Sequence, residues 1–261
     1  MPVRLGAVSY LNTLPLVWGL ERSASFDVRF DVPSRCAALL HAGSIDVGLI
    51  PVIEYLRGGD YRIVPGPALA SRGAVASVAL FTRRAMADVR SVAVDTSSRT
   101  SAALVRVLCR RLFSIAPAFE AVDPDPDLML SRCDAALVIG DNALFLEHSS
   151  RGIEKIDLGE AWFRMTGLPF VYAFWAGRAD AMNQDEVRLL QLARDEGVMR
   201  TAEIARRYSG GDERRRAIAE PYLRCNMKYD LGEDERAGVE AFYAYAAETD
   251  GGSVPQPLRF Y

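Results

Sequence analysis

The chain has 261 residues, half of them hydrophobic and a quarter charged, a composition typical of one large or two small globular domains. The formal net charge of −3 gives no electrostatic argument for nucleic-acid binding. No apolar run approaches the roughly 18 residues of a membrane-spanning helix, so no membrane association is expected. The first residues do not resemble a signal peptide, and four separated cysteines are typical of reduced thiols, so we expect a cytoplasmic protein.

The chain opens with an apolar run, Val3 to Val8, that predicts a buried strand. Four polar side chains follow within five positions, namely Ser9, Tyr10, Asn12 and Thr13. A helix is expected next, with Pro15 in its first turn, where proline is tolerated. Ligands of α/β sheets bind beyond the carboxyl ends of strands, and helix N-termini attract anions. The polar turn therefore predicts a ligand-facing segment, although helix capping also explains these residue types.

Two βα units follow the opening turn. Residues 26–32 alternate between apolar and polar side chains and predict a half-buried strand, and residues 33–43 predict a helix. A buried strand is expected at 45–50, with a helical turn at 52–56. Successive βα units imply a parallel sheet with right-handed crossovers. Beyond them, the sequence predicts a short strand at 61–64.

A proline-rich turn is expected at residues 65–67, before a long strand at 71–81. The continuous apolar end of that strand predicts burial on both faces. A second αβ series then begins, with its own polar turn at residues 95–101. Its other expected elements are strands at 91–94, 119–122 and 135–139 and helices at 102–112, 128–130 and 143–147. An apolar strand is expected at 170–176.

From residue 184 onward the sequence predicts only amphipathic helices, followed by a loop at 251–261. The basic cluster at residues 206–216 lies among acidic residues and predicts a solvated helix end. Two series of similar size, each opened by a strand and a polar turn, favour two α/β lobes with a cleft between them. The first lobe would comprise 1–82 plus 177–261 and the second 83–168, joined by crossing strands at 75–82 and 169–176. One continuous doubly wound sheet explains the same pattern.

The string SYLNTLPL at residues 9–16 resembles the N-terminal signature of the chorismate dehydratases of the futalosine route to menaquinone, the MqnA family. Four further segments are similar to that family: GAVASVALF (73–81), DTSSRTS (95–101), AALVIGD (135–141), and DLGEAW (157–162) with TGLPFVYA (166–173). The resemblance implies a fold like that of type 2 periplasmic binding proteins, with two lobes and two crossing strands. It therefore favours the two-lobed interpretation over the continuous sheet.

The resemblance implies a lyase that removes water from chorismate to give 3-[(1-carboxyvinyl)oxy]benzoate, without a cofactor or metal. Aromatisation of the ring drives this reaction, so the protein must hold a dianion, assist removal of a ring proton and help hydroxide leave. By the same resemblance, Asn12 orients the substrate, and Ser77 contacts a carboxylate or the departing hydroxyl. The residues implied to bind substrate are Ser9, Tyr10, Thr13, Ser98, Arg99, Thr100, Ser101 and Asp141.

Structural explanations of some of these residues remain open. Ser77 could be satisfied within its own strand, Asp141 could cap the following helix, and Ser98 or Thr100 could cap the helix after the polar turn. Arg99 would then face solvent.

The proton acceptor has several candidates. No motif contains a histidine, and His41 and His148 are expected at the surface, without metal-ligand spacing. The carboxylates of Glu54 and Asp141 are candidate bases. Alternatively, the enolpyruvyl carboxylate of the substrate takes the ring proton, and the protein acts by positioning and electrostatic stabilisation.

Two other functions compete with chorismate dehydration. The first is a cytosolic binding protein for a small carboxylate, without turnover. The second is the sister enzyme of the same pathway, which forms 1,4-dihydroxy-6-naphthoate and relies on a histidine base. The signature at residues 9–16 and the scarcity of histidine favour the dehydratase. The oligomeric state is not predicted.

Overall fold

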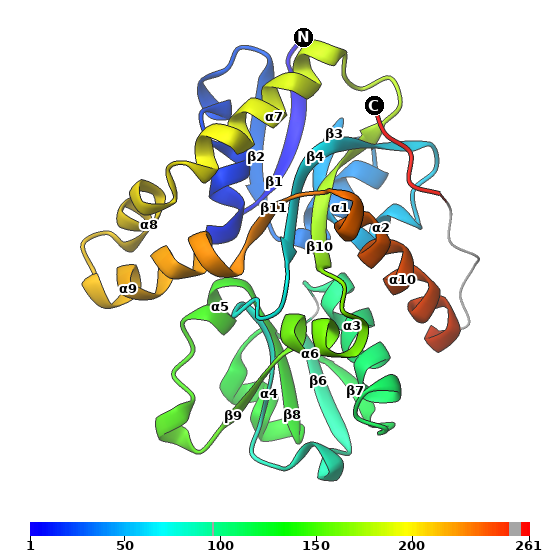
Figure 1. Ribbon diagram of the computed structural model, residues 1–261, viewed down its shortest axis with the longest axis vertical. Helices are drawn as coiled ribbons and strands as arrows, with labels where there is room; N and C mark the ends of the chain where they lie inside the picture. Colours follow the sequence, from blue (N-terminus) through cyan, green and yellow to red (C-terminus); the bar gives the residue numbers. More distant parts are fainter. Residues whose placement is uncertain (96, 251–256) are drawn as a thin grey trace.

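A computed structural model of the protein describes residues 1–95, 97–250 and 257–261. It contains two sheets, one above the other in Figure 1. The six-stranded sheet has the order β11-β4-β10-β3-β1-β2, and the five-stranded sheet has the order β7-β6-β8-β5-β9. The α/β class and the two-lobed architecture expected from the sequence are therefore confirmed. No helix in the described ranges has the length and apolar character needed to cross a membrane.

The parallel part of the six-stranded sheet comprises β1 (Val3–Val8), β2 (Phe26–Asp31) and β3 (Val47–Pro51). Helix α1 (Pro33–His41) connects β2 to β3, and α2 (Val52–Tyr55) follows β3. The predicted βα units and their parallel pairing are confirmed. Every residue of β3 is buried, in keeping with a central strand covered on both faces.

The segment after β1 differs from the expected helix. A 3-10 helix begins at Leu11 and ends at Val17, so Pro15 lies inside it and not in a first turn. No side chain caps this 3-10 helix, and the capping explanation of Ser9, Asn12 and Thr13 is therefore wrong. Pro15 lacks the N–H group that a regular α-helix would use at this position, which favours a short 3-10 segment.

Strand β4 (Tyr61–Ser71) runs through the expected turn at 65–67. Its partner β10 (Phe170–Arg178) is antiparallel, and their register shifts between Phe174 and Ala176. The extra residues of β4 at this shift form a bulge that contains Pro65 and Pro67, so the prediction of a turn at 65–67 is wrong. Bulges are one of the few places where a sheet accepts proline.

Strand β5 (Val78–Thr82) is shorter than the strand expected at 71–81. Ala76 has a φ of 65°, which interrupts extended backbone just before β5. Strand β5 pairs only with β8 and β9, whereas β10 pairs with β3 and β4, so each of these two strands belongs to one sheet. The chain passes between the sheets before β5 and again after α6 (Leu158–Thr166).

The five-stranded sheet also contains β6 (Ser91–Asp95), β7 (Ala118–Val122), β8 (Ala135–Ile139) and β9 (Glu154–Asp157). Alternate residues of β5 enter different hydrophobic clusters: Val78 and Leu80 join the large core, and Ala79 and Phe81 join a smaller one. This alternation confirms that β5 is buried on both faces. The sheet is flanked by α3 (Arg99–Arg111), α4 (Pro126–Arg132), α5 (Gly140–Leu144) and α6.

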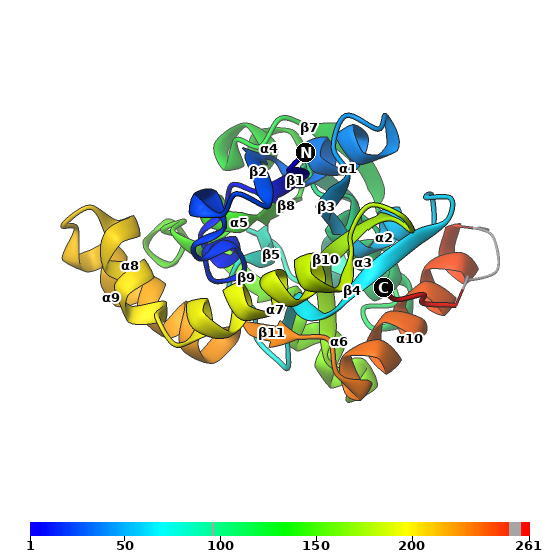
Figure 2. The ribbon, with the colours of Figure 1, turned by 90° about the horizontal axis from the view of Figure 1, so that it is seen from above.

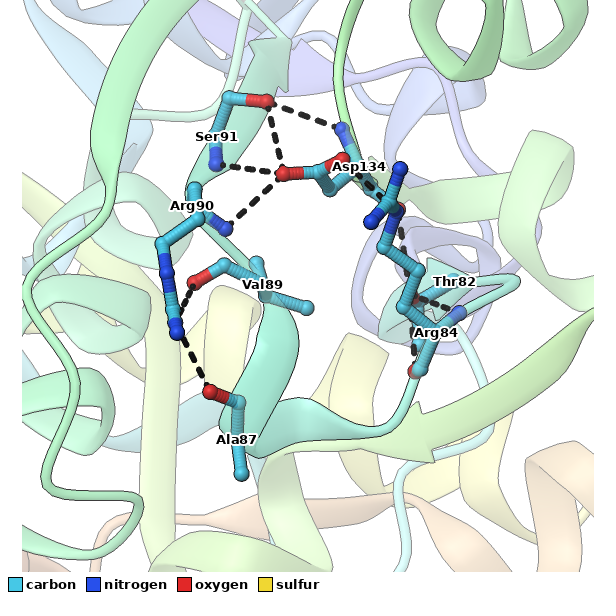
Figure 3. Close-up of polar contacts among 7 residues, drawn as sticks. All are labelled: Thr82, Arg84, Ala87, Val89, Arg90, Ser91 and Asp134. Carbon is cyan, nitrogen blue, oxygen red and sulfur yellow. Dashed lines mark hydrogen bonds and ion pairs between the residues drawn. The ribbon is translucent and has the colours of Figure 1, made fainter.

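A polar cluster joins the amino ends of β6 and β8 (Figure 3). The Asp134 carboxylate accepts hydrogen bonds from the backbone N–H groups of Arg90 (2.9 Å) and Ser91 (3.1 Å), and Arg84 lies 3.0 Å from its other oxygen. The backbone N–H of Arg90 is the main cause of the lowered pKa of Asp134. These contacts hold strands at the end of the sheet opposite its carboxyl edge.

The C-terminal part runs along one side of the molecule, from α8 and α9 at one end to α10 at the other (Figure 2). It comprises α7 (Gln184–Val198), α8 (Thr201–Ser209), α9 (Glu213–Pro221), a π-helix (Tyr222–Asn226), β11 (Lys228–Asp230) and α10 (Glu233–Asp250). The all-helical prediction is wrong at β11, a three-residue edge strand too short to show a periodic pattern. The solvated cluster expected at 206–216 lies at the end of α8 and in α9, where most arginines are exposed. Residues 251–256 of the expected C-terminal loop lie outside the described residues.

Candidate active site

The carboxyl ends of the central strands of both sheets point toward one pocket. Strands β1 and β3 approach it from the six-stranded sheet, and β6 and β8 approach it from the five-stranded sheet. The cavity volume of the pocket is about 60 Å³, and the pocket opens on one side to solvent. Small-molecule sites lie preferentially in clefts of this kind between domains. The lining residues are Val8, Tyr10, Asn12, Pro33, Pro51, Leu69, Val75, Ser77, Val78, Ser98, Arg99, Thr100, Ser101, Ile139, Gly140, Tyr172 and Ala173.

One wall is the Asn12 turn, which we define as residues 9–17. The side-chain oxygen of Asn12 is buried and has no hydrogen-bond partner among the described residues. The turn is held mainly by its backbone: the N–H of Leu11 donates to the Asp141 carboxylate at 3.2 Å, and helix α7 packs against it. Gly197 of α7 approaches so closely that an added Cβ would lie 2.0 Å from the carbonyl oxygen of Pro15.

The same turn reaches the five-stranded sheet through Tyr10. A Cβ on Gly140 would meet the Tyr10 ring at 2.8 Å, and Gly140 also has a φ of 62°. A larger residue at position 140 would therefore push the ring away from the carboxyl end of β8. Burial raises the pKa of Tyr10, so its hydroxyl remains a hydrogen-bond donor at neutral pH.

A second part of the lining is the Ser77 segment, which we define as residues 72–77. Ser77 is 1% exposed, and its Oγ accepts a hydrogen bond of 2.8 Å from the hydroxyl of Tyr222. Its carbonyl oxygen accepts from the N–H of Gly140 at 2.8 Å. The Ser77 oxygen therefore accepts from the π-helix, and the explanation that its own strand satisfies the hydroxyl is wrong.

The unusual backbone of Ala76 is held from β9 and α6. Both carboxylate oxygens of Asp157 accept hydrogen bonds, one from the N–H of Val75 at 3.0 Å and the other from the N–H of Ala76 at 2.6 Å. Lys155 Nζ donates to the Ala76 carbonyl at 2.6 Å. A non-glycine residue in the left-handed region is strained by roughly 1 kcal/mol or more and persists only when its surroundings fix it. Lys155 and Asp157 thus fix the peptide that precedes Ser77.

A third part of the lining is the N-terminal turn of α3, residues 98–101. Ser98 occupies the N-cap position of α3, but its side chain makes no capping hydrogen bond. The hydroxyl of Thr100 accepts from the N–H of Ile53 at 3.4 Å, which ties α3 to α2 and not to its own helix end. The first backbone N–H groups of a helix lack intrahelical acceptors and carry partial positive charge, so this turn is suited to an anion.

Arg99 belongs to that turn and does not simply face solvent. Its Nη1 lies 2.6 Å from Glu54, whose side chain is fully buried. Glu54 also contacts Arg57 at 2.7 Å and His41 at 3.2 Å. The guanidinium of Arg99 is therefore anchored to Glu54, and Arg99 is one of the residues that line the pocket. An anchored guanidinium loses less conformational entropy on binding a carboxylate.

The structure brings seven of the ten proposed site residues together around the pocket: Tyr10, Asn12, Ser77, Ser98, Arg99, Thr100 and Ser101. The others lie outside its lining. Ser9 is exposed, whereas Thr13 is fully buried with a hydroxyl that has no partner in the described part of the chain. Asp141 accepts from Leu11 and from the hydroxyl of Tyr208 at 2.7 Å, and the residue before α5 is Ile139, so Asp141 does not act as that helix cap.

No carboxylate or imidazole lines the pocket within the described residues. Glu54, a candidate base, is occupied by three cationic or basic groups. His41 lies at the surface as expected, with its ring stacked on Tyr61. The surface prediction for His148 is wrong, because its ring is half-buried against Phe81.

Two residues of the site were not among those that the sequence singled out. Tyr222 reaches Ser77 from a C-terminal segment that reads only as amphipathic helix, and Tyr172 lines the pocket from the apolar strand β10. Asp157 was detectable in part, since it begins the DLGEAW segment, whereas Lys155 lies outside that segment. The hydroxyls of Ser77 and Tyr222 meet although the two residues lie 145 positions apart, so no local sequence pattern predicts their contact.

Comparison with solved structures places the fold among the periplasmic binding proteins. The alkanesulfonate-binding protein SsuA of Xanthomonas axonopodis superposes with a TM-score of 0.70 at 15% identity, over 98% of this chain and 94% of that one. Protein AF1704 of Archaeoglobus fulgidus gives a TM-score of 0.74 at 18% identity, over 96% and 98%. At these identities the likeness concerns the fold alone.

Sequence comparison gives the family. Residues 3–248 match the family model described as menaquinone biosynthesis. A chorismate dehydratase of Thermus thermophilus is 33% identical over 262 residues, covering 92% of this chain and 94% of that protein. A chorismate dehydratase of Campylobacter jejuni is 30% identical over 177 residues, 64% of each chain. This chain belongs to the menaquinone-biosynthesis family, which confirms the resemblance seen in its sequence.

Proposed function

We propose that this protein is a chorismate dehydratase, a carbon–oxygen lyase that converts chorismate to 3-[(1-carboxyvinyl)oxy]benzoate and water. The family match and the relative from Thermus thermophilus support the assignment. The observation that carries it at the level of residues is the pocket itself. Asn12, Ser77 and Arg99 come from distant parts of the chain and meet there, beside the N-terminal turn of α3.

Recognition of the substrate would rest on its two carboxylates. Arg99 offers a guanidinium anchored by Glu54, and the first turn of α3 offers backbone N–H groups and the hydroxyls of Ser98 and Ser101. Charge-assisted hydrogen bonds of these kinds are the stronger ones in proteins. The apolar part of the lining, including Val8, Val78 and Ile139, suits the ring and excludes water.

In the proposed reaction a ring C–H bond and the neighbouring C–O bond break, the ring becomes aromatic, and the released proton and hydroxide leave as water. Asn12 would orient the substrate through its unpaired side-chain oxygen, which requires a donor such as the substrate hydroxyl. Ser77 would contact a carboxylate or the departing oxygen. Stabilising charge as it develops on that oxygen lowers the barrier most.

The proposed proton acceptor is the enolpyruvyl carboxylate of the substrate. The support for this is the composition of the lining, since neither Glu54 nor Asp141 is part of it. Both carboxylates are already hydrogen-bonded or ion-paired to groups of the protein. The protein would then contribute positioning and electrostatics and supply no base of its own. This reading needs no cofactor.

Closure of two lobes around the dianion is part of the proposal, with the six-stranded sheet in one lobe and the five-stranded sheet, which includes β5, in the other. Contacts between α2 and α3 and between α5 and α8 support it, because they span the two sheets beside the pocket. We also propose a cytoplasmic location, which the four free cysteines support.

A direct assay tests the assignment. Purified protein is incubated with chorismate, and the mixture is followed by ultraviolet absorbance and by mass for the loss of one water. Turnover to the carboxyvinyloxybenzoate is expected. Binding of chorismate without loss of water would favour a binding protein. If chorismate is neither bound nor changed while a cyclic futalosine derivative is consumed, the sister enzyme is the better assignment.

A further inference from the structure

The segment that follows α9 contacts the Ser77 segment at two points. Pro221 ends α9, and the chain continues as a π-helix from Tyr222 to Asn226. Tyr222 donates to Ser77 Oγ at 2.8 Å, and the side-chain amide of Asn226 donates to the carbonyl of Ala74 at 2.9 Å. Short π-helical turns are rare and frequently lie at functional sites.

The hydrogen bond between Tyr222 and Ser77 has a defined direction. Burial raises the pKa of the Tyr222 hydroxyl far above neutral pH, so this hydroxyl keeps its proton and can donate it. The geometry of the contact makes Ser77 Oγ the acceptor. A serine hydroxyl has one proton, and once its oxygen accepts from a neighbour, that proton must point elsewhere.

Ser77 Oγ donates no hydrogen bond to any of the described residues. The nearby Asp157 carboxylate and Ala76 carbonyl accept instead from backbone N–H groups and from Lys155. Ser77 lines the pocket, so the pocket is the direction left for its hydroxyl proton.

We propose that Tyr222 is a positioning residue that turns Ser77 into a hydrogen-bond donor toward the bound ligand. The inference rests on the proposed function and deepens it: Ser77 donates to an oxygen that is anionic or becomes so, either a carboxylate oxygen or the departing hydroxyl. No proton is transferred from Ser77. The ring proton and the hydroxide leave together as water, and both hydroxyls of the protein keep their protons throughout.

The test is the variant Tyr222→Phe, which removes one oxygen and keeps the buried ring. We expect kcat for chorismate to fall roughly 10- to 100-fold, with KM changed by less than about 3-fold, because the hydrogen bond is proposed to matter most as charge develops. In a Ser77→Ala background, the same change should have no further effect on kcat. An unchanged kcat in Tyr222→Phe, or an equal loss in both backgrounds, overturns the proposal.

Two matched variants separate orientation from structural support. Tyr229→Phe removes another buried tyrosine hydroxyl, which has no partner among the described residues, and should leave kcat and KM as in the parent. Asn226→Ala removes the other contact of the π-helix with the same segment. It should lower the melting temperature but keep kcat within about 3-fold. If Asn226→Ala lowers kcat as much as Tyr222→Phe, Tyr222 supports the backbone and does not orient the hydroxyl.

A measurement without turnover distinguishes failure of this proposal from failure of the proposed function. In tyrosine-labelled protein, the buried Tyr222 hydroxyl should give a slowly exchanging proton NMR signal that disappears in Tyr222→Phe and shifts in Ser77→Ala. Absence of that signal overturns the orientation of the hydroxyl pair, whatever the substrate. If the signal is present but chorismate is not consumed by the parent, the proposed function fails and the oriented Ser77 donor remains.

Discussion

The Asn12 turn and the Ser77 segment face the same pocket but are fixed in different ways. Tyr222, Lys155, Asp157 and Gly140 all form hydrogen bonds to the last three residues of the Ser77 segment. The Asn12 side chain has an oxygen without any such partner in the described part of the chain. A buried amide oxygen left unpaired is costly, whereas a paired hydroxyl is stable. The Asn12 turn thus offers a free acceptor to a ligand, whereas the Ser77 hydroxyl is held by a hydrogen bond from within the protein.

The largest expected effect follows from replacing either polar side chain. Asn12→Ala and Ser77→Ala should each lower kcat/KM for chorismate by on the order of 100-fold, as the loss of one hydrogen bond to a developing charge does in other enzymes. Their effects on stability should differ. Asn12→Ala removes an unpaired atom and should change the free energy of unfolding by less than about 1 kcal/mol.

Ser77→Ala instead leaves the Tyr222 hydroxyl without an acceptor and should lower the free energy of unfolding by about 1–3 kcal/mol. Urea titrations of the two variants and the parent measure the difference. Equal losses of stability would remove the contrast between the two walls.

A second prediction concerns the support of the Asn12 turn by α7. Gly197→Ala would gain about 1 kcal/mol of helix propensity, but its Cβ would lie 2.0 Å from a backbone oxygen of Pro15. We expect a net loss of about 1–3 kcal/mol in the free energy of unfolding, together with lower kcat/KM, because the helix and the turn must move apart. Gly59→Ala is the control, since an added Cβ there meets nothing within 4 Å. A stabilised Gly197→Ala variant would contradict this account.

A third prediction concerns the strained peptide before Ser77. Asp157→Ala removes the acceptor of the Val75 and Ala76 N–H groups and should lower the free energy of unfolding by about 2 kcal/mol. Ala76→Gly removes the strain of a φ of 65° and should raise the free energy of unfolding by about 0.5 kcal/mol. In the double variant the loss caused by Asp157→Ala should shrink. Strictly additive effects in thermal melts would mean that Asp157 does not hold Ala76 in this conformation.

The smallest expected effect is a pH dependence at the Asn12 turn. Burial raises the pKa of Asp141, which accepts from Leu11 and Tyr208, so the folded protein binds its proton more tightly than the unfolded chain. The contribution of this group to stability is therefore greatest below its unfolded pKa and is lost as pH rises through the folded pKa.

Asp141→Asn abolishes that dependence. The difference in melting temperature, variant minus parent, should therefore increase as the pH rises from 4 to 7. A constant difference across this range would show that the carboxyl of Asp141 does not titrate differently in the two states.

The parts of the fold that sequence could predict are those with a local period. Strand β8 was predicted with its observed bounds because five apolar residues are followed at once by Gly140. The bulge in β4 and the edge strand β11 could not be predicted, because the first places prolines within a strand and the second has three residues. In both cases pairing with a distant strand decides the local structure.

The site shows the same limit. The polar turns at 9–13 and 97–101 were identified because hydroxyl and amide side chains cluster after predicted strands. Their partners were not: Glu54 was a candidate base, yet it anchors Arg99, and Asp141 was a candidate cap, yet it bonds Leu11 and Tyr208. Sequence indicates which residues are chemically able to serve. Which of them are already hydrogen-bonded or ion-paired to other groups of the protein depends on contacts between distant parts of the chain.

The hydroxyl pair of Ser77 and Tyr222 also bears on how the protein is made. The two residues are separated by 145 positions, and ribosomes add about 5–20 residues per second, so their synthesis is separated by on the order of ten seconds. During that interval the five-stranded sheet can form, but the partner that directs the Ser77 hydroxyl does not yet exist. A nascent chain can therefore present a folded pocket wall well before it can work, and activity should appear only after the π-helix has been synthesised and has docked.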